Sequence, residues 1–501
     1  MLASLRSAAL FGLDAIPVDV EVDVTFGLPA LVLVGLPDAS VRESRDRVRS
    51  AIRNSGYQFP LQRVTVNLAP ADVRKAGTAF DLPIALGVLA ATGVVTTPTI
   101  ADTLIVGELS LDGSMLPTRG ALSVAALARQ RGFTRLVLPA ANAAEAAMVD
   151  GLTLLPADSL TEAVAVLNDP ARVRPRLPPP VPPPTAEEPD LSEVHGQHLA
   201  RRALEIAAAG GHNLLMVGPP GAGKTMLARR LPGLLPPLAF DEALEVTTVH
   251  SVAGLLPPNG GLMAHRPFRA PHHTISDTAL VGGGSVPRPG EISLAHHGVL
   301  FLDEAPEFNR RALEVLRQPL EHGTIVVARA ARTAVFPARF ALVAAMNPCP
   351  CGFFGDPRRA CTCTPPEVQR YAGRLSGPLR DRIDLVVPLS ALPAATLHAA
   401  EPGEASAAVR ARVLAARALQ VVRGGSRLNA QLDGRHLLRT DRIRPEARTT
   451  LLQAVERLGL SARAYHRVLR VAQTIADLAQ AREVDSSHVA EALQFRSEGA
   501  A

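Results

Sequence analysis

The stretch that decides the fold of this chain reads Gly218-Pro219-Pro220-Gly221-Ala222-Gly223-Lys224-Thr225. It has the spacing GxxxxGK[ST], in which a glycine-rich loop joins a buried strand to a helix. The apolar run Asn213–Val217 precedes it, and Met226–Leu231 is typical of the first turns of a helix. Backbone N–H groups in such a loop surround phosphates at a helix N-terminus, where the helix dipole favours anions. We therefore expect an ATP site, with Lys224 on the phosphates and Thr225 on Mg²⁺.

A second motif downstream supplies two carboxylates, in the run Val299-Leu300-Phe301-Leu302-Asp303-Glu304. Its four apolar residues predict a buried parallel strand. Asp303, at the end of that strand, is expected to hold Mg²⁺ through water, and Glu304 to polarise the attacking water. An Asp-Glu pair alone is common after a strand, but together with the glycine-rich loop it predicts ATP hydrolysis. Positioning and charge neutralisation do most of the catalytic work in such a reaction.

Composition sets the outer limits of the interpretation. The chain has 501 residues, enough for about three domains, and its hydrophobic content of 47% allows sizeable cores. A net charge of +5 is compatible with nucleic acid binding without establishing it. The absence of Trp and the aromatic content of 3% argue against a base-stacking surface. No run reaches about 18 uninterrupted apolar residues, so we expect a cytoplasmic protein without a membrane span.

The elements expected along the chain give an α/β fold in several parts. Residues 1–168 form the first part, where Val18–Val24 alternates as a half-buried strand does and Asp38 is expected to cap a helix running to Ser55. Further strands are expected at 31–35, 63–68, 104–109 and 136–138, and further helices at 81–91 and 121–131. Seven prolines between Pro175 and Pro184 predict a semi-rigid linker over 169–189. The ATPase core then spans 190–392, and a helical domain spans 393–501.

Several further motifs carry a resemblance to a known family. The core resembles AAA+ proteins of the magnesium-chelatase and replicative-helicase branch, and the whole chain is similar to the ComM/YifB competence-protein family. The motifs are 218–225, Arg269-Ala270-Pro271-His272-His273-Thr274, Pro289-Gly290-Glu291-Ile292-Ser293, 299–304, Met346-Asn347-Pro348-Cys349-Pro350-Cys351-Gly352 and Leu375-Ser376-Gly377-Pro378-Leu379-Arg380-Asp381-Arg382-Ile383-Asp384.

The resemblance implies roles for residues at matching positions. Asn347 would be the first sensor, which orients the attacking water. Arg382 would be an arginine finger that reaches the γ-phosphate of a neighbouring subunit, a contribution of about 10³–10⁵ in rate. Arg463 would be the second sensor, carried by a helical lid, with Arg374 and Arg467 as neighbours that could share the role. An arginine finger acting in trans makes hydrolysis depend on a homo-oligomeric ring, expected to be a hexamer.

The first domain resembles the proteolytic domain of Lon-type proteases, through Gly107–Gly113 and Leu116-Pro117. Those enzymes use a Ser–Lys dyad. The segment Arg74–Ala79 matches the region around the nucleophile, with Ala79 where the Ser would stand, and Leu122 falls at the position of the Lys. Covalent catalysis needs a nucleophile and an activating base, so we expect the fold of a protease without its activity.

The four cysteines lie in one stretch: Cys349, Cys351, Cys361 and Cys363. A cytosolic setting argues against disulfides, and four thiolates on two tight turns can surround Zn²⁺ tetrahedrally. The usual zinc-binding spacing is C-x₂-C, and here each pair is one residue shorter. Zinc, reduced structural thiols and redox chemistry remain the three alternatives. The pairs His272-His273 and His296-His297 could also ligate metal, or hydrogen-bond within the core or between subunits.

A predicted hairpin is the candidate DNA contact. Thr324–Ala328 and Thr333–Phe336 are expected to form its strands, with Arg329 and Arg332 at the tip. In the helicase branch that the core resembles, such a hairpin points into the central pore, where arginines could bind phosphates of any sequence. Arg266 and Arg269 are the second candidates. The alternative is an ordinary surface hairpin with solvated arginines.

Three functions remain open on the sequence. The leading one is an ATP-driven ring motor that acts on single-stranded or branched DNA, with branch migration in recombination as the role that the resemblance implies. The second is a chelatase-type motor that remodels a partner protein. The third is an ATP-gated scaffold that binds DNA without moving along it. A chelatase motor subunit would not need the Lon-like domain in front of it, which slightly favours the first.

Overall fold

The computed structural model describes most of the chain. The described residues are 1–71, 75, 77–96, 98–169, 189–256, 260–284, 286–328, 333–391, 403–425, 427–432 and 442–496. Nearly all of the expected proline-rich linker, the start of the expected C-terminal domain at 393, and the hairpin tip with Arg329 and Arg332 lie outside these residues. In the described part, no helix is both long and apolar enough to cross a membrane.

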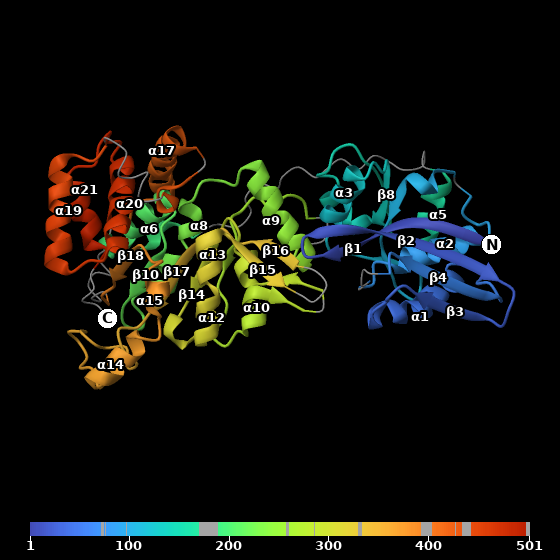
Figure 1. The fold of residues 1–501 in the computed structure, drawn as a ribbon, viewed down its shortest axis with the longest axis horizontal. Helices are drawn as coiled ribbons and strands as arrows, with labels where there is room; N and C mark the ends of the chain where they lie inside the picture. The colour runs from blue at the N-terminus through green and yellow to red at the C-terminus, as the bar shows by residue number, and fades with distance from the viewer. Residues whose placement is uncertain are drawn as a thin grey trace.

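A seven-stranded mixed sheet organises the N-terminal part (Figure 1). Its strands run in the order β3-β4-β2-β1-β5-β8-β9, with β1 and β2 as a long antiparallel hairpin and β5, β8 and β9 parallel. The strands are β1 (Leu2–Phe11), β2 (Asp14–Thr25), β3 (Ala30–Val34), β4 (Arg63–Ala69), β5 (Thr103–Ile105), β8 (Arg135–Pro139) and β9 (Thr153–Ala157). The helices are α1 (Ala39–Asn54), α2 (Asp81–Ala91), α3 (Ala121–Gln130), α4 (Ala143–Ala146) and α5 (Leu160–Asn168), and β6 (Glu108–Leu109) pairs with β7 (Met115–Leu116).

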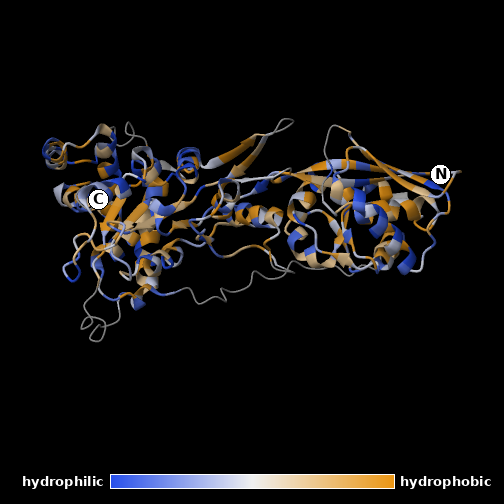
Figure 2. Cartoon of the chain, turned by 90° about the horizontal axis from the view of Figure 1, so that it is seen from below, coloured by the Kyte–Doolittle hydropathy of each residue, from blue (hydrophilic) through white to orange (hydrophobic). Residues whose placement is uncertain are grey.

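The N-terminal part has three layers, with the sheet between two sets of helices, because the side chains of each strand alternate between its two faces. Leu5 and Ala9 of β1 join one hydrophobic cluster with α1, α2 and α5, whereas Ala8 joins a second cluster with α3. Successive side chains of a strand point to opposite faces, so each face of the sheet receives its own helices. Figure 2 shows hydrophobic residues concentrated along the strands of the sheet.

A five-stranded parallel sheet forms the centre of the second part, where the sequence predicts the ATPase core, in the order β11-β14-β17-β10-β18. Its strands are β10 (Leu214–Val217), β11 (Phe268–Arg269), β14 (Val299–Leu302), β17 (Ala341–Met346) and β18 (Leu385–Pro388). Buried parallel strands read as continuous apolar runs, which explains why β10 and β14 were visible in the sequence. The mixed α/β class expected from the sequence is confirmed by these two sheets.

Helices cover both faces of this sheet and extend into the C-terminal part. The helices of the core are α6 (His198–Gly210), α7 (Lys224–Ala228), α8 (Leu231–Leu234), α9 (Phe240–Ala253), α10 (Asp277–Val281), α11 (Glu291–Leu294), α12 (Arg310–Val315), α13 (Arg317–His322), α14 (Pro365–Ala372) and α15 (Gly377–Arg380). The C-terminal helices are α17 (Ser406–Gly424), α19 (Pro445–Leu458), α20 (Ala462–Leu478) and α21 (Ser486–Gln494). Both α17 and α20 pack on α6, in one hydrophobic cluster with β10. The C-terminal helices therefore share a hydrophobic core with the five-stranded sheet.

Local predictions compare closely with the structure in the first 168 residues. Asp38 caps α1 by accepting a hydrogen bond from the Val41 backbone N–H at 2.9 Å, as expected, and α2 spans the predicted 81–91. The strand expected at 104–109 is instead two short strands, β5 and β6. Strand β1 was not predicted, because Leu2–Phe11 has polar residues without the strict alternation seen in β2.

The N-terminal part and the core meet at α9 and at the hairpin of β15 (Thr324–Ala328) and β16 (Thr333–Pro337). Buried Glu145 accepts hydrogen bonds from the Ser251 hydroxyl of α9 and, at 2.8 Å, from the Leu122 backbone N–H. Burial raises the pKa of Glu145, although its three hydrogen bonds oppose that shift. A buried carboxyl with hydrogen-bond donors from two domains ties those domains together. If the domains separate, the carboxyl loses a donor, and an unsatisfied buried acceptor costs free energy.

We predict that Ser251→Ala loosens this contact. Removing one donor from a buried carboxyl costs about 1–3 kcal/mol, so amides of α3 and the end of α9 should exchange roughly 5- to 150-fold faster with deuterium. Thr248→Ala is the matched control, because the Thr248 hydroxyl donates to the Leu244 carbonyl of its own helix, at 2.8 Å, and bonds to no other described residue. Equal exchange in both variants would contradict a docking role for Ser251.

Candidate functional site

The glycine-rich loop joins β10 to α7 and leaves open space beside it. Gly221 and Gly223 have φ of +76° and +88°, a region that favours glycine, and a Cβ built on either would meet nothing within 4 Å. The space faces backbone N–H groups at the start of a helix, which is suited to phosphate. On the strand side Gly218 has no such room, since a Cβ there would lie 2.7 Å from the Leu389 carbonyl oxygen.

Register in the parallel sheet brings three expected site residues together. Val217 pairs with Met346 and Leu302 with Ala344, so the residues that follow these strands lie at one edge. Lys224 Nζ donates to Asn347 Oδ1 at 3.0 Å and to the Gly218 carbonyl at 2.6 Å. Burial lowers the pKa of Lys224, and the nearby carboxylates act in the opposite direction. The ammonium group is therefore held over the loop next to Asn347.

The two carboxylates lie on the other side of the loop. Thr225 Oγ1 donates to Asp303 Oδ2 at 2.8 Å, and the Glu304 backbone N–H donates to Asp303 Oδ1 at 3.0 Å. A hydroxyl and a carboxylate at this separation are the oxygen ligands that Mg²⁺ prefers, and they fit that ion. Glu304 has φ of +50°, unusual outside glycine, and its side chain is half exposed. Strained backbone of this kind gathers at functional sites.

His273 and Tyr371 were not assigned to this site from the sequence. His273 Nδ1 lies 3.5 Å from Glu304 Oε2. Burial raises the pKa of Tyr371 to about 12, and Tyr371 also receives a hydrogen bond from the Asn347 backbone. Both therefore flank the residues expected to handle water. The sequence carried a signal for His273, in the motif 269–274, but nothing in it showed that this motif folds against Glu304.

A cavity of about 290 Å³ continues from the loop toward the start of α6, lined by Glu193, Val194, His195, Gln197, 220–223, Met226, Leu227, Arg358 and Ala391. Gln197 is the residue that joins the two walls, since its amide donates to the Ala222 carbonyl at 3.3 Å and the Ser390 carbonyl at 2.7 Å. Its φ of +48° is a second unusual backbone angle at the site. Sequence reasoning missed this wall, because no spacing rule links 193–197 to the loop.

Arg382 lies away from these groups, in the loop after α15. Its guanidinium pairs with Glu321 of α13 and donates to the Pro378 carbonyl at 2.8 Å. The side chain borders a hollow of about 480 Å³ between α12, α13 and β15. Among its contacts in the described part of the chain, none joins it to the glycine-rich loop, which is compatible with action on another subunit.

The three arginines expected near the second sensor have different settings. Arg463, in the first turn of α20, is 77% exposed and lies 3.4 Å from Asp381. Arg467 is buried and donates to the carbonyls of Arg380 and Ile383, both at 3.1 Å. Arg374 pairs with Glu307 at 2.8 Å, beyond the second motif. Arg467 thus anchors the loop that carries Arg382, whereas the head group of Arg463 is exposed and lies beside Asp381.

The arginines expected to contact DNA are only partly described. Arg329 and Arg332 lie outside the described residues. The hairpin strands on either side of them, β15 and β16, form as predicted: Thr324 lies opposite Pro337 at one end and Ala328 lies opposite Thr333 at the other. Arg266 is nearly buried and donates to Glu242 at 2.8 Å and to three backbone carbonyls. Arg269 is paired through two 2.6 Å bonds with Glu291. These internal contacts argue against Arg266 and Arg269 as DNA contacts.

The pair His296-His297 forms a hydrogen-bonded cluster with Glu245 of α9. Glu245 Oε2 lies 2.7 Å from His296 Nε2 and 3.0 Å from His297 Nε2. Arg339 donates its backbone N–H to His296 Nδ1 at 3.0 Å, which leaves the ring proton on Nε2. Burial lowers the pKa of His296 to about 4, so the ring is neutral. These hydrogen bonds agree with the alternative in which the His296-His297 pair bonds within the core.

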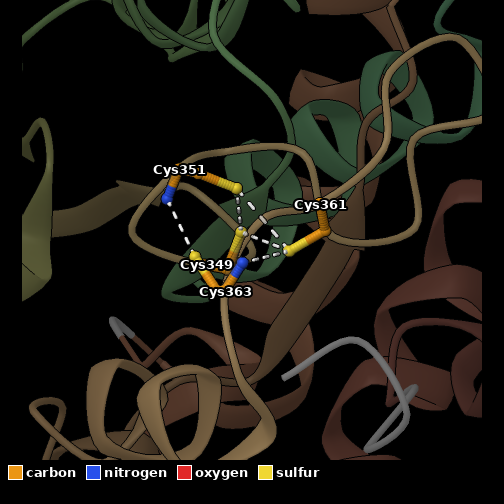
Figure 3. A group of neighbouring side chains, drawn as sticks. All are labelled: Cys349, Cys351, Cys361 and Cys363. Atoms are coloured by element: carbon orange, nitrogen blue, oxygen red, sulfur yellow. Dashed lines mark hydrogen bonds between the residues drawn. The ribbon is translucent and has the colours of Figure 1, made fainter.

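The four cysteines converge on one point (Figure 3). The structure records all four as free, with Cys349 buried and the others partly exposed. Cys349 Sγ lies 3.3 Å from Cys351 Sγ and 3.7 Å from Cys361 Sγ. Backbone hydrogen bonds from Phe353 and Thr362 lower the pKa of Cys351 to about 5. The predicted cluster therefore forms, and the stretch 349–363 directly follows Asn347.

Comparison with known proteins gives matches along almost the entire chain. Residues 190–397 match the family described as magnesium chelatase, subunit ChlI, residues 20–142 match subunit ChlI of Mg-chelatase, and residues 403–496 match the ChlI C-terminal family. A YifB protein of Salmonella typhimurium is 45% identical over 499 residues, covering 99% of this chain and 97% of its own. The competence protein ComM of Haemophilus influenzae is 44% identical over 512 residues, with the same coverage.

We predict that Glu304→Gln keeps ATP binding and slows hydrolysis by at least about 100-fold, because the amide cannot accept a proton from water. Binding is measured with a fluorescent ATP analogue and turnover by phosphate release. Glu307→Gln is the control, since Glu307 is a nearby carboxylate that pairs with Arg374. Wild-type turnover in Glu304→Gln would rule out Glu304 as the group that activates water.

Proposed function

Because the chain belongs to the YifB/ComM family of magnesium-chelatase-like ATPases, we propose that it is an ATP-driven ring motor that acts on DNA. Its role would be branch migration during recombination in natural transformation. The observation that carries the proposal is the convergence of the loop with both carboxylates and Asn347. Thr225 bonds to Asp303 at 2.8 Å, and Lys224 bonds to Asn347 at 3.0 Å.

The proposed division of labour follows from the chemistry of each group. Residues 218–224 bind the phosphates of ATP, and Thr225 and Asp303 hold Mg²⁺, which neutralises charge on the phosphates. Glu304 accepts a proton from the attacking water, with His273 at 3.5 Å to orient its carboxylate. Asn347 positions the same water through its side chain. Such fixed groups supply rate through positioning and electrostatics, as phosphoryl transfer requires.

Arg382 supports a ring, because its setting suits a neighbour's site better than its own. In the single chain it pairs with Glu321 beside an open hollow. Docking of a second copy in that hollow would bring a γ-phosphate within reach, and the phosphate would replace Glu321 as its partner. Arg463 would complete the site as second sensor. We propose a hexameric ring of identical subunits on this basis.

DNA as the substrate is supported by two separate observations. The related Haemophilus protein is named a competence protein, and competence concerns DNA uptake. The hairpin β15–β16 projects from the core beside α13, at the margin of the hollow that Arg382 borders. Arg329 and Arg332 at its tip would offer bidentate contacts to phosphate without sequence preference.

A motor that remodels a protein partner is the second candidate. All three family matches are to segments of the magnesium-chelatase subunit ChlI, which favours that alternative. The two candidates share the ATP site and differ in what stimulates it. DNA stimulates the first and leaves the second unchanged.

We predict that Arg382→Ala binds ATP normally and loses turnover, since the charge it supplies serves another subunit. Mixing Arg382→Ala with Lys224→Ala should restore part of the activity, because some interfaces then pair an intact loop with an intact Arg382. Phosphate release from titrated mixtures gives the measurement, and Arg380→Ala is the control, because Arg380 is an exposed arginine at the end of α15, two residues before Arg382. Mixtures no more active than either variant alone would contradict action in trans.

We also predict that single-stranded or branched DNA stimulates ATP turnover, and that Arg329→Ala with Arg332→Ala abolishes this stimulation and strand separation. Basal turnover should stay near normal, because the hairpin tip is remote in sequence from the phosphate-binding loop and carries none of the residues assigned to the ATP site. Arg310→Ala with Arg311→Ala removes the same charge from the exposed start of α12 and serves as control. If no DNA structure changes turnover of the parent, the protein-remodelling function replaces the DNA motor.

A further inference from the structure

The cysteine cluster has the dimensions of a tetrahedral metal site. Cys351 Sγ lies 3.6 Å from Cys361 Sγ, and the ligand atoms of all four cysteines lie within 4.8 Å of one another. A disulfide needs sulfur atoms about 2.05 Å apart. Zinc–sulfur bonds of about 2.3 Å at tetrahedral angles place sulfur atoms about 3.8 Å apart. The separations therefore fit four ligands around one ion and do not fit a disulfide.

Backbone amides around the cluster are arranged to support thiolates. The Cys351 N–H donates to Cys363 Sγ at 3.4 Å, which ties the first pair to the second (Figure 3). Phe354 donates its N–H to Cys349 Sγ at 3.3 Å, and Cys363 donates to Cys361 Sγ at 3.4 Å. Outer hydrogen bonds of this kind orient metal ligands and offset their charge. The short C-x-C spacing is thus compatible with two tight turns that face each other.

The second candidate cluster in the described part of the chain, Glu245 with His296 and His297, does not fit a metal in the same way. His296 Nδ1 accepts the Arg339 N–H, so its Nε2 carries the proton that it donates to Glu245. A protonated ring nitrogen has no lone pair for a metal. The chemistry of the donors therefore singles out the cysteines.

The loop between the two cysteine pairs packs on the phosphate-binding loop. Gly352 has φ of +86° and is buried, and a Cβ there would lie 2.7 Å from Pro220 Cδ and 3.9 Å from Asn347 Cγ. Only a residue without a side chain allows this approach. The residue directly after the first pair of cysteines thus lies against the loop that would bind ATP.

Arg358, in the same segment, lines the 290 Å³ cavity together with 220–223. Asp356 receives the Arg358 backbone N–H at 2.7 Å and lies 3.8 Å from its guanidinium. The neighbouring Arg359 instead stacks over the Phe353 ring at 4.2 Å. One of two adjacent arginines is thus directed to the nucleotide cavity, by a segment whose two ends are the cysteine pairs.

We propose that Cys349, Cys351, Cys361 and Cys363 bind one Zn²⁺, and that this ion holds residues 352–360 against the phosphate-binding loop so that Arg358 contacts the bound nucleotide. The zinc site is independent of the proposed function, whereas the contact of Arg358 rests on the proposed ATP site. A guanidinium offers charge-assisted hydrogen bonds to the phosphates of such a ligand. Loss of the ion would release the segment and weaken nucleotide binding without touching the loop itself.

The first experiment measures metal in full-length protein purified without chelators. Elemental analysis should find about one zinc per chain in the parent and in Glu245→Gln, and none in Cys361→Ser with Cys363→Ser. Those two cysteines are partly exposed, and circular dichroism checks that the variant folds. Should it misfold, a thiol-blocking mercurial titrated into the parent should release one zinc per four thiols. Metal-free parent protein, or zinc lost only in Glu245→Gln, would overturn the proposal.

The second experiment separates the zinc site from the nucleotide contact. Arg358→Ala should keep its zinc and bind a fluorescent ATP analogue about tenfold more weakly, the loss expected for one charge-assisted hydrogen bond. Arg359→Ala should keep both zinc and affinity. Equal affinity in the two variants would overturn the contact of Arg358 and leave the zinc result standing. A parent that binds no ATP analogue at all would instead contradict the proposed function.

Discussion

Parallel pairing of β10, β14 and β17 is the constraint on which the site depends. Parallel strands end at the same edge of a sheet, so the residue after each strand arrives next to the others. The register of the strands determines which residues meet at this edge: Gly218 follows β10, Asp303 follows β14 and Asn347 follows β17. The bonds of Lys224 to Asn347 and of Thr225 to Asp303 are consequences of that alignment. A slip of one residue in any strand would turn its polar group away from the loop.

The same edge receives support from segments that are distant in sequence. Gln197, before α6, bonds to the loop and to the segment after β18, and the cysteine stretch after β17 packs on Pro220 through Gly352. A loop with two flanking contacts has fewer conformations available before a ligand binds. Preorganised groups lose less entropy on binding, which is how the outer shell of a site contributes to affinity. His273 extends this shell on the water side, opposite Glu304.

Contacts also run outward from the ATPase sheet to the other parts of the chain. Buried Arg467 of α20 binds the carbonyls around Asp381, so the C-terminal helices hold the loop that presents Arg382. Glu145 binds α9, and the turn at Gly12 lies against Ala334 of the β15–β16 hairpin, so the N-terminal part touches the hairpin expected to meet DNA. These are packed, buried contacts, of the kind that transmit small displacements between sites.

The sequence by itself determined what depends on local spacing. The loop 218–225, the apolar strands β10 and β14, the cap at Asp38 and the β15–β16 hairpin are short-range patterns, and each formed where it was expected. The convergence of the four cysteines followed from their closeness in the chain. Tertiary structure alone decided the long-range partners: His273 beside Glu304, Gln197 on the loop, and the burial of Arg266 against Glu242. The physical reason is that side-chain identity and spacing fix backbone preference, whereas contacts between distant segments depend on how sheets and helices pack.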